Sequence, residues 1–473
     1  MSTYVPPPNS IPTLKVPELD GIRRVHMIGI GGAGMRNLAR LFLARGVEVS
    51  GSDLKDSHGV QELQGLGAAV AVGHTEDNLG DPDAVVVSSA IREHNPELAE
   101  ARRRGIPVWA RAQALAAAAS GRRQIAVSGT HGKTTTTAMI AHVLERARLD
   151  PTYVIGGDTN ESGSGARAGK GDLFVTEADE SDGSFLLGRP ALGVVTNVEV
   201  DHVDFYAGGI EEIERAFTAF AERCERVVVC ADDPVALRAV SASGRPNVTY
   251  GSAPKADLRI EITSAGPGRG RATLFDGGSR YDLSLLVDGA HNLSNAAAAV
   301  AVAREVGVEP TVAVEALASF NGVHRRFERR GTVRGAEFFD DYGHVPTELS
   351  VTVDVARRRA PGRLVAVFQP HRYSRTQALW RELGESLIGA DVIVVTDIYG
   401  AEQDPIPGVT GKLVVEGVAR AGRHRRVVYL PHRHDVVEFL AREVREGDLV
   451  VTMGCGDVWM LGDAALERMR EAS

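Results

Sequence analysis

The sequence predicts an α/β protein with three domains: a Rossmann-like N-terminal domain, a central P-loop domain with a mostly parallel sheet, and a Rossmann-like C-terminal domain. Short apolar runs of strand length alternate with helical segments along the whole chain. Two of the strand-to-helix junctions carry glycine loops, and 473 residues are enough for three domains. We expect a flexible arm over residues 1–20 and domains over residues 21–120, 121–321 and 322–473.

The N-terminal domain begins with a predicted strand, a glycine loop and a helix. Gly29, Gly31 and Gly34 have the spacing G-x-G-x-x-G, with Gly32 in the same loop, and Asp53 follows Gly34 by nineteen residues. This pattern is typical of dinucleotide-binding loops, in which backbone N–H groups approach a pyrophosphate and the acid binds a ribose. Any nucleoside diphosphate satisfies it. Strands are predicted over residues 25–30, 47–50, 84–88 and 108–109.

Ser88 ends the third of these strands in a run of small polar residues. Ligands of parallel sheets bind at the carboxyl ends of the strands, so Ser88 is a candidate ligand contact. A plain turn is the alternative.

The central domain opens with a second glycine loop between an apolar strand, residues 125–127, and a helix. Glycines at such a junction let backbone N–H groups cradle phosphates, Lys133 would reach the β- and γ-phosphates, and the Thr134 hydroxyl would hold Mg²⁺. The standard pattern has a glycine where this chain has Val127, so a glycine turn with a surface lysine is the alternative. The predicted nucleotide-binding residues are Gly129, Thr130, His131, Gly132, Lys133, Thr134 and Thr135.

Carboxylates crowd the end of the next predicted strand, where residues 173–176 run into Glu177 and the acidic segment up to residue 182. Like charges at this density require a cation, and Mg²⁺ accepts carboxylate and phosphate oxygens together. His202 follows a further strand, and since histidine is an uncommon Mg²⁺ ligand, a second, softer ion such as Mn²⁺ is conceivable there. A solvated acidic loop is the alternative. Residues 247–288 predict antiparallel hairpins added to one side of the sheet.

Asn292 and Asn295 begin an alanine-rich helix at a spacing of three residues, so they share a helix face. Their amides are suited to hydrogen bonds with a base such as adenine. Helix capping by Asn292 is the alternative.

The C-terminal domain places His, Arg and Tyr side chains in two loops that follow predicted strands. Such loops suit a small zwitterion, because an arginine binds its carboxylate and a polar group binds its amine. Arg325 and Arg326 lie just after the domain boundary and suit a phosphate, with plain surface charge as the alternative. The candidates in the two loops are Tyr342, His344, His371 and Arg375.

The composition excludes several classes of protein. With 53 basic and 62 acidic residues the net charge is −9, which does not favour a general nucleic-acid or membrane-surface binder. The three cysteines lack metal-ligand spacing, and Cys455 fits a small buried residue better than a reactive thiol. No signal peptide and no run of about 18 apolar residues is visible. We expect a cytoplasmic monomer or homodimer without membrane insertion.

Taken together, the motifs strongly resemble the bacterial Mur ligase family over about residues 20–460. The resemblance rests on GIGGAGM, GTHGKTT, EADESD, TNVEVDHVD, HNLSNA, HRRFE, DDYGH, QPHRYSRT and YGAEQDPIPG, in this order. It implies an N-terminal domain for a UDP-sugar, a central ATPase domain and a C-terminal domain for an amino acid. The motifs are most similar to the alanine-adding branch. This branch implies an ATP-dependent ligase that joins L-alanine to the carboxylate of UDP-N-acetylmuramate through an acyl phosphate.

The resemblance also implies roles for individual residues. Lys133, Glu177, His202, Arg326, His344 and His371 would be catalytic, with Thr134, Glu177 and His202 at the metal site. Asn292 and Asn295 would lie on the adenine side. The UDP-sugar and the amino acid would contact Gly29, Gly31, Gly32, Gly34, Asp53, Ser88, Arg325, Tyr342, His344, His371 and Arg375.

The chain departs from the family pattern at two positions. Val345 stands where the family usually has a second histidine after His344, so any role of that histidine is met differently here. Phe217 stands near the position where several relatives have a carbamylated lysine, which the alanine-adding branch generally lacks.

Three other functions remain open from sequence. A ligase that attaches a recycled tripeptide to the same UDP-sugar shares most motifs. An NAD-dependent oxidoreductase would use Gly29–Gly34 and Asp53 but leaves Lys133 and Glu177 unexplained. A non-catalytic nucleotide-gated binding protein would not require Lys133, Glu177 and His202 together.

Overall fold

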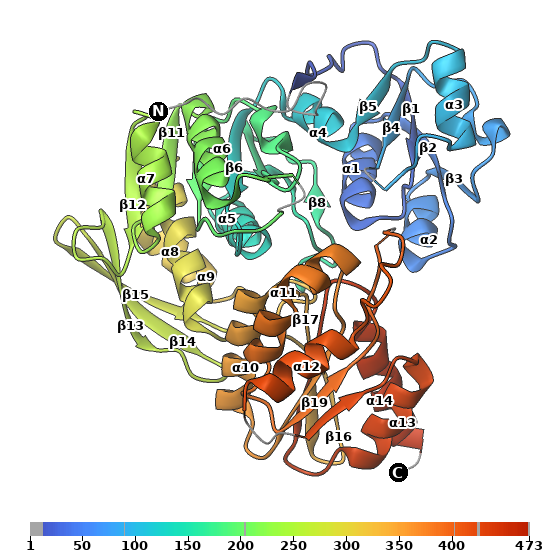
Figure 1. The fold of residues 1–473 in the computed structure, drawn as a ribbon. Helices are drawn as coiled ribbons and strands as arrows, with labels where there is room; N and C mark the ends of the chain where they lie inside the picture. The colour runs from blue at the N-terminus through green and yellow to red at the C-terminus, as the bar shows by residue number, and fades with distance from the viewer. Residues whose placement is uncertain (1–12, 89, 203–204, 402, 423–425, 472–473) are drawn as a thin grey trace. The chain divides into compact units, whose positions relative to one another are not determined.

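The computed structural model describes residues 13–88, 90–202, 205–401, 403–422 and 426–471 (Figure 1). Residues 1–12 of the predicted arm lie outside the described residues. The chain forms two compact units, one comprising residues 1–264 and 271–321 and the other residues 265–270 and 322–473. The first unit contains two sheets and the second contains one. The domain limits given above remain a proposal.

The N-terminal sheet has five parallel strands in the order β3-β2-β1-β4-β5. The edge strand β3 was not predicted, because its four residues are short for a strand and no apolar face of it is buried. The glycine loop follows the central strand, β1, as predicted. The strands are β1 (Arg24–Ile28), β2 (Glu48–Asp53), β3 (Ala69–Val72), β4 (Ala84–Val87) and β5 (Val108–Ala110).

Helices cover both faces of this sheet. α1 and α4 pack on one face around Met27 and Val86, and α3 packs on the other around Ile28 and Val85. Burial on both faces explains why β1 and β4 are continuous apolar runs. The helical segments are α1 (Ala33–Ala44), α2 (His58–Gly65), η2 (Glu76–Leu79), α3 (Pro96–Arg103) and α4 (Arg111–Ala119).

The central sheet has ten strands in the order β15-β14-β13-β12-β11-β10-β6-β9-β7-β8. The predicted hairpins are confirmed, because β13 and β14 pair antiparallel and extend one side of the sheet. The short strands β7 and β8 on the other side were not predicted. The strands are β6 (Arg123–Ser128), β7 (Thr152–Val154), β8 (Ala166–Arg167), β9 (Leu173–Glu177), β10 (Leu192–Val195), β11 (Arg226–Cys230), β12 (Asn247–Gly251), β13 (Leu258–Ser264), β14 (Gly270–Asp276) and β15 (Ser279–Leu285).

The phosphate-loop helix and the alanine-rich helix of this domain are both buried along most of their length. α5 and α8 pack against each other, and small alanine side chains in α8 allow that close approach. α6 and α7 enclose a separate apolar cluster around Phe217 and Phe220. The helical segments are α5 (Lys133–Arg146), η3 (Ser184–Leu186), α6 (Gly209–Arg223), α7 (Pro234–Ala242), α8 (Ala290–Glu305) and α9 (Pro310–Leu317).

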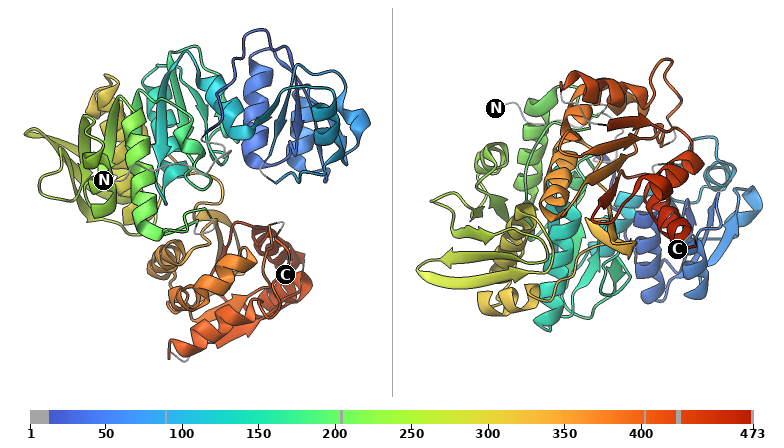
Figure 2. Two further views of the ribbon diagram at one scale, coloured as in Figure 1. Left: turned by 45° about the horizontal axis from the view of Figure 1, so that its top comes forward. Right: turned by 90° about the horizontal axis from the view of Figure 1, so that it is seen from below.

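The C-terminal sheet has six strands in the order β16-β17-β21-β18-β19-β20, all parallel except β16 (Figure 2). α10, α11 and α12 pack on one face, and α13 and α14 pack on the other. The strands are β16 (Glu328–Val333), β17 (Ala336–Asp341), β18 (Leu364–Phe368), β19 (Val392–Val395), β20 (Arg426–Tyr429) and β21 (Leu449–Met453). The helices are α10 (Pro346–Arg359), α11 (Tyr373–Ser386), α12 (Lys412–Arg420), α13 (Arg433–Glu443) and α14 (Trp459–Glu471).

Within the described residues, every helix is too short or too polar to cross a membrane.

Candidate active site

The phosphate loop lies where three parallel strands of the central sheet end together. β6 leads into the loop and is flanked by β9, which ends at Glu177, and by β10, which ends just before Thr196. Val127 pairs with Glu177 inside the sheet and is fully buried, so the position of the standard first glycine belongs to the strand here. The phosphate loop and the acidic segment were predicted to lie in the same sheet, and the structure confirms it: both lie at the carboxyl ends of neighbouring strands.

Two loop glycines are required by close contacts. A Cβ on Gly129 (φ +136°) would lie 2.0 Å from Thr196 Oγ1. A Cβ on Gly132 (φ +81°), which caps α5, would lie 2.8 Å from Asn295 Oδ1. Both glycines have left-handed φ values that other residues adopt only at a cost. The loop is therefore narrow and has one backbone path.

Thr196 and Asn197 hold this path through hydrogen bonds to the loop backbone. Thr196 Oγ1 donates to the His131 carbonyl at 2.7 Å, and Asn197 Nδ2 donates to the same carbonyl at 3.0 Å. Asn197 Oδ1 accepts from the His131 N–H at 2.8 Å, and the Asn197 carbonyl accepts from the Thr130 N–H at 3.0 Å. The loop is thus preorganised before any phosphate binds.

Lys133 is paired with Glu180, a residue of the acidic segment. Its Nζ lies 2.8 and 2.9 Å from the two carboxylate oxygens of Glu180, and it donates to the Gly129 carbonyl at 2.7 Å. Burial raises the pKa of Glu180 to about 7, despite the opposing effect of Lys133. Burial lowers the pKa of Lys133, but the carboxylates of Glu180, Asp179 and Glu177 outweigh it, so its pKa lies above the ordinary value. The lysine is therefore charged and lies at the phosphate loop.

The predicted metal-site residues offer suitable donors but are not drawn into one tight group. Glu177 Oε1 accepts from the Gly156 N–H at 2.6 Å, and Thr134 is the second residue of α5. His202 Nε2 lies 3.8 Å from Glu180 Oε1 and 3.4 Å from Asp201 Oδ2. The carboxylate and hydroxyl oxygens are donors that fit Mg²⁺. In proteins Mg²⁺ usually keeps water and phosphate oxygens as its other ligands, so it does not require a site made of protein groups alone.

Asn292 and Asn295 share one helix face, as predicted, because Asn295 Nδ2 donates to Asn292 Oδ1 at 3.3 Å. Asn292 Nδ2 donates to the Asp288 carbonyl at 2.7 Å, whereas Gly289 occupies the N-cap position of α8. The capping alternative for Asn292 is therefore wrong. Asn295 also packs against Gly132, which links α8 directly to the phosphate loop.

The N-terminal glycine loop brings Asp53 and Ser88 together with its glycines. Asp53 Oδ2 accepts from the Gly31 N–H at 2.9 Å. A Cβ on Gly29 (φ +77°) would lie 3.2 Å from Ser88 Cβ. The Ser88 hydroxyl also accepts from the Ala90 N–H at 3.3 Å, so this serine starts a turn as well. In this structure Asp53 therefore supports the loop backbone.

Arg325 and Arg326 enclose the ring of Tyr342 in the C-terminal domain. Each guanidinium carbon lies 5.0 Å from the ring centre. Arg325 also donates to Asp340 Oδ2 at 3.0 Å and to the Gly454 carbonyl at 2.5 Å. Burial raises the pKa of Tyr342 to about 12, so its hydroxyl is a donor at neutral pH.

His344, His371 and Arg375 are also brought together. The two imidazole rings meet edge to face at 5.5 Å, and Arg375 Nη1 donates to His371 Nδ1 at 3.2 Å. His371 stacks on Tyr399 at 5.9 Å. Val345, which replaces the usual second histidine, is buried and occupies the N-cap position of α10.

Sequence reasoning missed several residues at these sites. Glu180 lay inside a segment whose four carboxylates could not be ranked, and Thr196 and Asn197 lie in the motif TNVEVDHVD but had no role assigned to them. Arg111 had no signal in the sequence, although a Cβ on Gly34 would lie 3.1 Å from its Nη1. Burial raises the pKa of Asp179, but the charge of Lys133, a backbone hydrogen bond and the charge of Arg111 outweigh burial, so this pKa lies below its ordinary value. These contacts join residues that are far apart in sequence, which only the fold reveals.

The chain belongs to the Mur ligase family, a class of ATP-dependent ligases that form amide bonds. Three consecutive segments match it: residues 24–123 match "Mur ligase family, catalytic domain", residues 127–303 match "Mur ligase middle domain", and residues 325–456 match "Mur ligase, glutamate ligase domain". The first match assigns the Gly29–Gly34 loop to a ligase family and not to an NAD-dependent oxidoreductase.

Similar proteins of known name share nearly the full length of the chain. The UDP-N-acetylmuramate–L-alanine ligase of Thermobifida fusca is 48% identical over 469 residues, covering 96% of this chain and 98% of that protein. The crystal structure of a UDP-N-acetylmuramate-alanine ligase from Thermotoga maritima matches with a TM-score of 0.82 at 30% identity, covering 95% of this chain and all of the other. A murein peptide ligase from Psychrobacter arcticus has a TM-score of 0.74 at 25% identity, covering 95% and 99%.

Proposed function

We propose that this chain joins L-alanine to the carboxylate of UDP-N-acetylmuramate with ATP, the first amino-acid step of peptidoglycan precursor synthesis. The observation that carries the proposal is the 48% identity over 469 residues to a ligase of that name. The preorganised phosphate loop with charged Lys133 supports it. The proposed setting is the cytoplasm, where the chain acts as a monomer or homodimer.

The chemistry explains why a phosphate loop is needed. A carboxylate is a poor electrophile, so one of its oxygens attacks the γ-phosphorus of ATP, the bond to the β-phosphate oxygen breaks, and ADP leaves. The acyl phosphate then accepts the alanine amine at its carbonyl carbon, and inorganic phosphate leaves as the amide forms. The protein contributes mainly position and charge stabilisation to such a transfer.

In the central domain, backbone N–H groups from Gly129 to Thr134 cradle the phosphates at the N-terminus of α5. Lys133 exchanges part of its contact with Glu180 for phosphate oxygens, and Glu180 keeps the lysine charged and aimed at the loop. Thr134 and Glu177 would hold Mg²⁺, with His202 beside them, and the ion would supply positive charge against the phosphates. A softer ion such as Mn²⁺ suits the His202 side better. Asn292 and Asn295 line the adenine side.

The remaining roles are distributed over the other two domains. The loop from Gly29 to Gly34, with Asp53 and Ser88, takes the UDP-sugar. Arg326 offsets charge on the transferred phosphoryl group. The amino acid is bound by residues of the C-terminal domain, namely Arg325, Tyr342, His344, His371 and Arg375.

The attacking amine must be neutral, so a base has to take its proton. His344 and His371 are the candidates by residue type, since imidazole takes up a proton near neutral pH.

Omitting substrates one at a time tests the proposed function. ADP and phosphate should form only when ATP, UDP-N-acetylmuramate and L-alanine are all present, and a product heavier than the UDP-sugar by one alanine residue should appear in the mass spectrum. Sustained ADP release without the UDP-sugar or without alanine would count against a ligase. Faster turnover with a peptide acceptor than with alanine would favour the tripeptide-adding alternative.

A further inference from the structure

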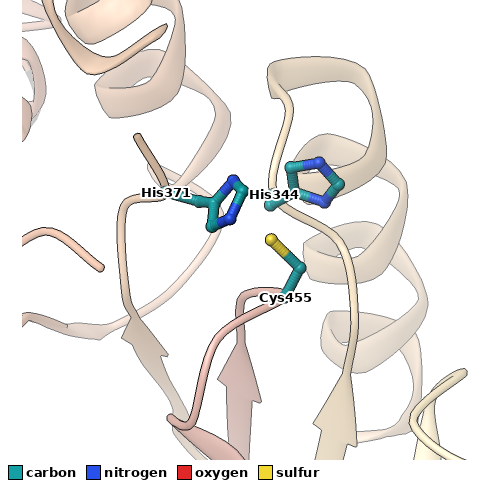
Figure 3. A group of neighbouring side chains, drawn as sticks. All are labelled: His344, His371 and Cys455. Carbon is teal, nitrogen blue, oxygen red and sulfur yellow. The ribbon is translucent and has the colours of Figure 1, made fainter. Parts of the chain in front are cut away.

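Two imidazoles and a thiol converge at the carboxyl edge of the C-terminal sheet. Among the described residues, one group of three His, Cys, Asp or Glu side chains has its ligand atoms all within 4.8 Å of one another, and it consists of His344, His371 and Cys455. The sulfur of Cys455 points toward the space between the two imidazole rings (Figure 3). We call this group the His₂Cys cluster.

The strand order explains the convergence. β21 lies between β17 and β18, and Met453 at its end pairs with Asp341 on one side and with Phe368 on the other. Cys455 follows β21 by two residues, and each histidine follows its own strand by three residues. The thiol therefore emerges between the two imidazoles, although the three residues lie far apart in sequence.

Close packing holds Cys455 in place. Gly454 has φ +144°, and a Cβ there would lie 2.8 Å from the Gln369 carbonyl oxygen. A Cβ on Gly456 would lie 2.4 Å from Gln369 Oε1 and 2.7 Å from the Tyr399 ring. The turn that carries the thiol thus has little freedom. Cys455 is half-buried, not the fully buried packing residue that the sequence suggested.

The two histidines are also oriented by their neighbours. His344 Nδ1 lies 3.2 Å from the Tyr342 carbonyl, which can only accept, so Nδ1 donates and Nε2 presents a lone pair. A hydrogen bond from the second ring nitrogen to a carbonyl is the usual support of a metal-binding histidine. His371 is held by its stacking on Tyr399, with ring planes 13° apart.

The donor set selects a class of ion. Imidazole nitrogen and thiolate sulfur are ligands for Zn²⁺ and similar soft ions, whereas Mg²⁺ requires oxygen. Three protein ligands leave the fourth tetrahedral position open. Two charges oppose a cation here: Arg375 Nη1 contacts His371 Nδ1 at 3.2 Å, and Arg325 lies on the Gly454 carbonyl. An ion must compete with Arg375 for His371, which favours reversible binding over a permanent structural site.

We propose that the His₂Cys cluster binds one Zn²⁺-like ion reversibly and that the bound ion excludes the acceptor amino acid. Binding replaces the Sγ–H bond of Cys455 by an Sγ–metal bond, and the proton passes to the buffer. The second part rests on the proposed function, because His344 and His371 are the residues proposed to bind alanine. The ion is then an inhibitor whose site is separate from the Mg²⁺ site of the central domain.

The first experiment measures Zn²⁺ alone against the full chain without any substrate. Competition with a chromophoric chelator should give one ion per chain. In the Cys455→Ser variant the affinity should fall more than about 100-fold, beyond what loss of an outer-sphere partner costs. Cys230→Ala is the matched control, since Cys230 is a buried thiol of another domain, and it should keep the wild-type affinity. Equal affinity in wild type and Cys455→Ser would overturn the site.

Co²⁺ substitution tests the site without any variant. Co²⁺ bound to the wild-type chain should show a thiolate-to-metal charge-transfer band and the intense visible bands of tetrahedral coordination. A weak octahedral spectrum without charge transfer would overturn the proposal even if Cys455→Ser does not fold.

Zn²⁺ should also inhibit ligation competitively with L-alanine and not with ATP. Inhibition competitive with ATP, or none at saturating Zn²⁺, would overturn the second part. The chelator titration requires no turnover. Failure of the proposed metal site can therefore be distinguished from failure of the proposed ligase activity.

Discussion

The two glycine loops of the first unit share the order strand, glycine loop, helix, but they carry different side chains. Each follows a strand inside a parallel sheet and precedes a helix, and each contains glycines that close contacts require. In the N-terminal loop a carboxylate, Asp53, accepts from the Gly31 N–H. In the central loop a lysine, Lys133, is paired with the buried carboxylate of Glu180.

The difference shows that side chains, and not the glycines, distinguish a loop that only binds a nucleotide from a loop at which phosphoryl transfer takes place. Both loops offer N–H groups at a helix N-terminus, which suit any phosphate. The central loop adds a lysine that is held directly by the carboxylate of Glu180, the arrangement suited to a reaction in which charge shifts between phosphate oxygens beside a metal ion. The N-terminal loop suits a nucleotide that is held without reaction.

Replacing Lys133 should cause the largest loss of turnover and so test the difference between the two loops most strongly. In Lys133→Ala the turnover number should fall by about 10³-fold or more, because the charge opposite the transferring phosphoryl group is lost. The affinity for UDP-N-acetylmuramate, measured by calorimetry, should stay unchanged. Lys55→Ala, at an exposed lysine of the N-terminal domain, is the control and should retain full activity. Loss of UDP-sugar affinity in Lys133→Ala would break the assignment of separate ligands to the two loops.

Gly129→Ala should cause the next largest loss of turnover. The new Cβ would lie 2.0 Å from Thr196 Oγ1, so the loop must shift. A displacement of about 1 Å costs roughly 10²-fold in rate, and steady-state kinetics with ATP as the varied substrate should show it. Gly121→Ala also places an alanine at a positive φ (+76°, against +136° at Gly129) but with no atom within 4 Å, and should remain active. Equal losses in both variants would mean that strain, and not the contact with Thr196, limits the loop.

Glu180→Gln should change the pH dependence of stability. Burial raises the pKa of Glu180 from its ordinary value of about 4.5 to about 7, so the folded chain keeps a proton that the unfolded chain has lost between these values. The wild type should therefore lose stability relative to Glu180→Gln as the pH rises from about 4.5 to about 7, with no further change above. Thermal midpoints of both proteins across this range provide the measurement. Parallel profiles would show that Glu180 is ionised throughout.

Asp53→Ala should have the smallest effect. Loss of one charge-assisted hydrogen bond of a half-buried carboxylate, worth about 1.5 kcal/mol, should raise the KM for the UDP-sugar roughly tenfold and leave the KM for ATP unchanged. Asp81→Ala, at an exposed carboxylate of the same domain, is the control. An increase in the KM for ATP would show that the two loops are not independent.

Much of the fold was predictable because its physical causes are local. Buried strands such as β6 and β18 contain continuous apolar runs, and glycine loops directly follow β1 and β6. The missed strands include β3, β7 and β8, which have two to four residues each and which pairing with neighbours stabilises more than their own composition does, and the six-residue β16, which carries three charged residues.

The sites were predictable where one short segment carries the chemistry, as with the loop around Lys133. They were not predictable where distant residues meet. The pairing of Lys133 with Glu180, the support from Thr196, and the approach of Cys455 to two histidines all depend on the order of strands in a sheet. Cysteine spacing alone gave no sign of the His₂Cys cluster, because its other members are histidines in the loops that follow the two strands beside β21.

The central claim is that the triphosphate at the phosphate loop is consumed in activating a carboxylate, and transfer of an oxygen isotope tests it most directly. UDP-N-acetylmuramate labelled with ¹⁸O in both carboxylate oxygens is incubated with the enzyme, ATP and L-alanine, and the products are analysed by mass spectrometry. The account predicts one ¹⁸O atom in each inorganic phosphate released and the other in the new amide. Amide formation with unlabelled phosphate would contradict it.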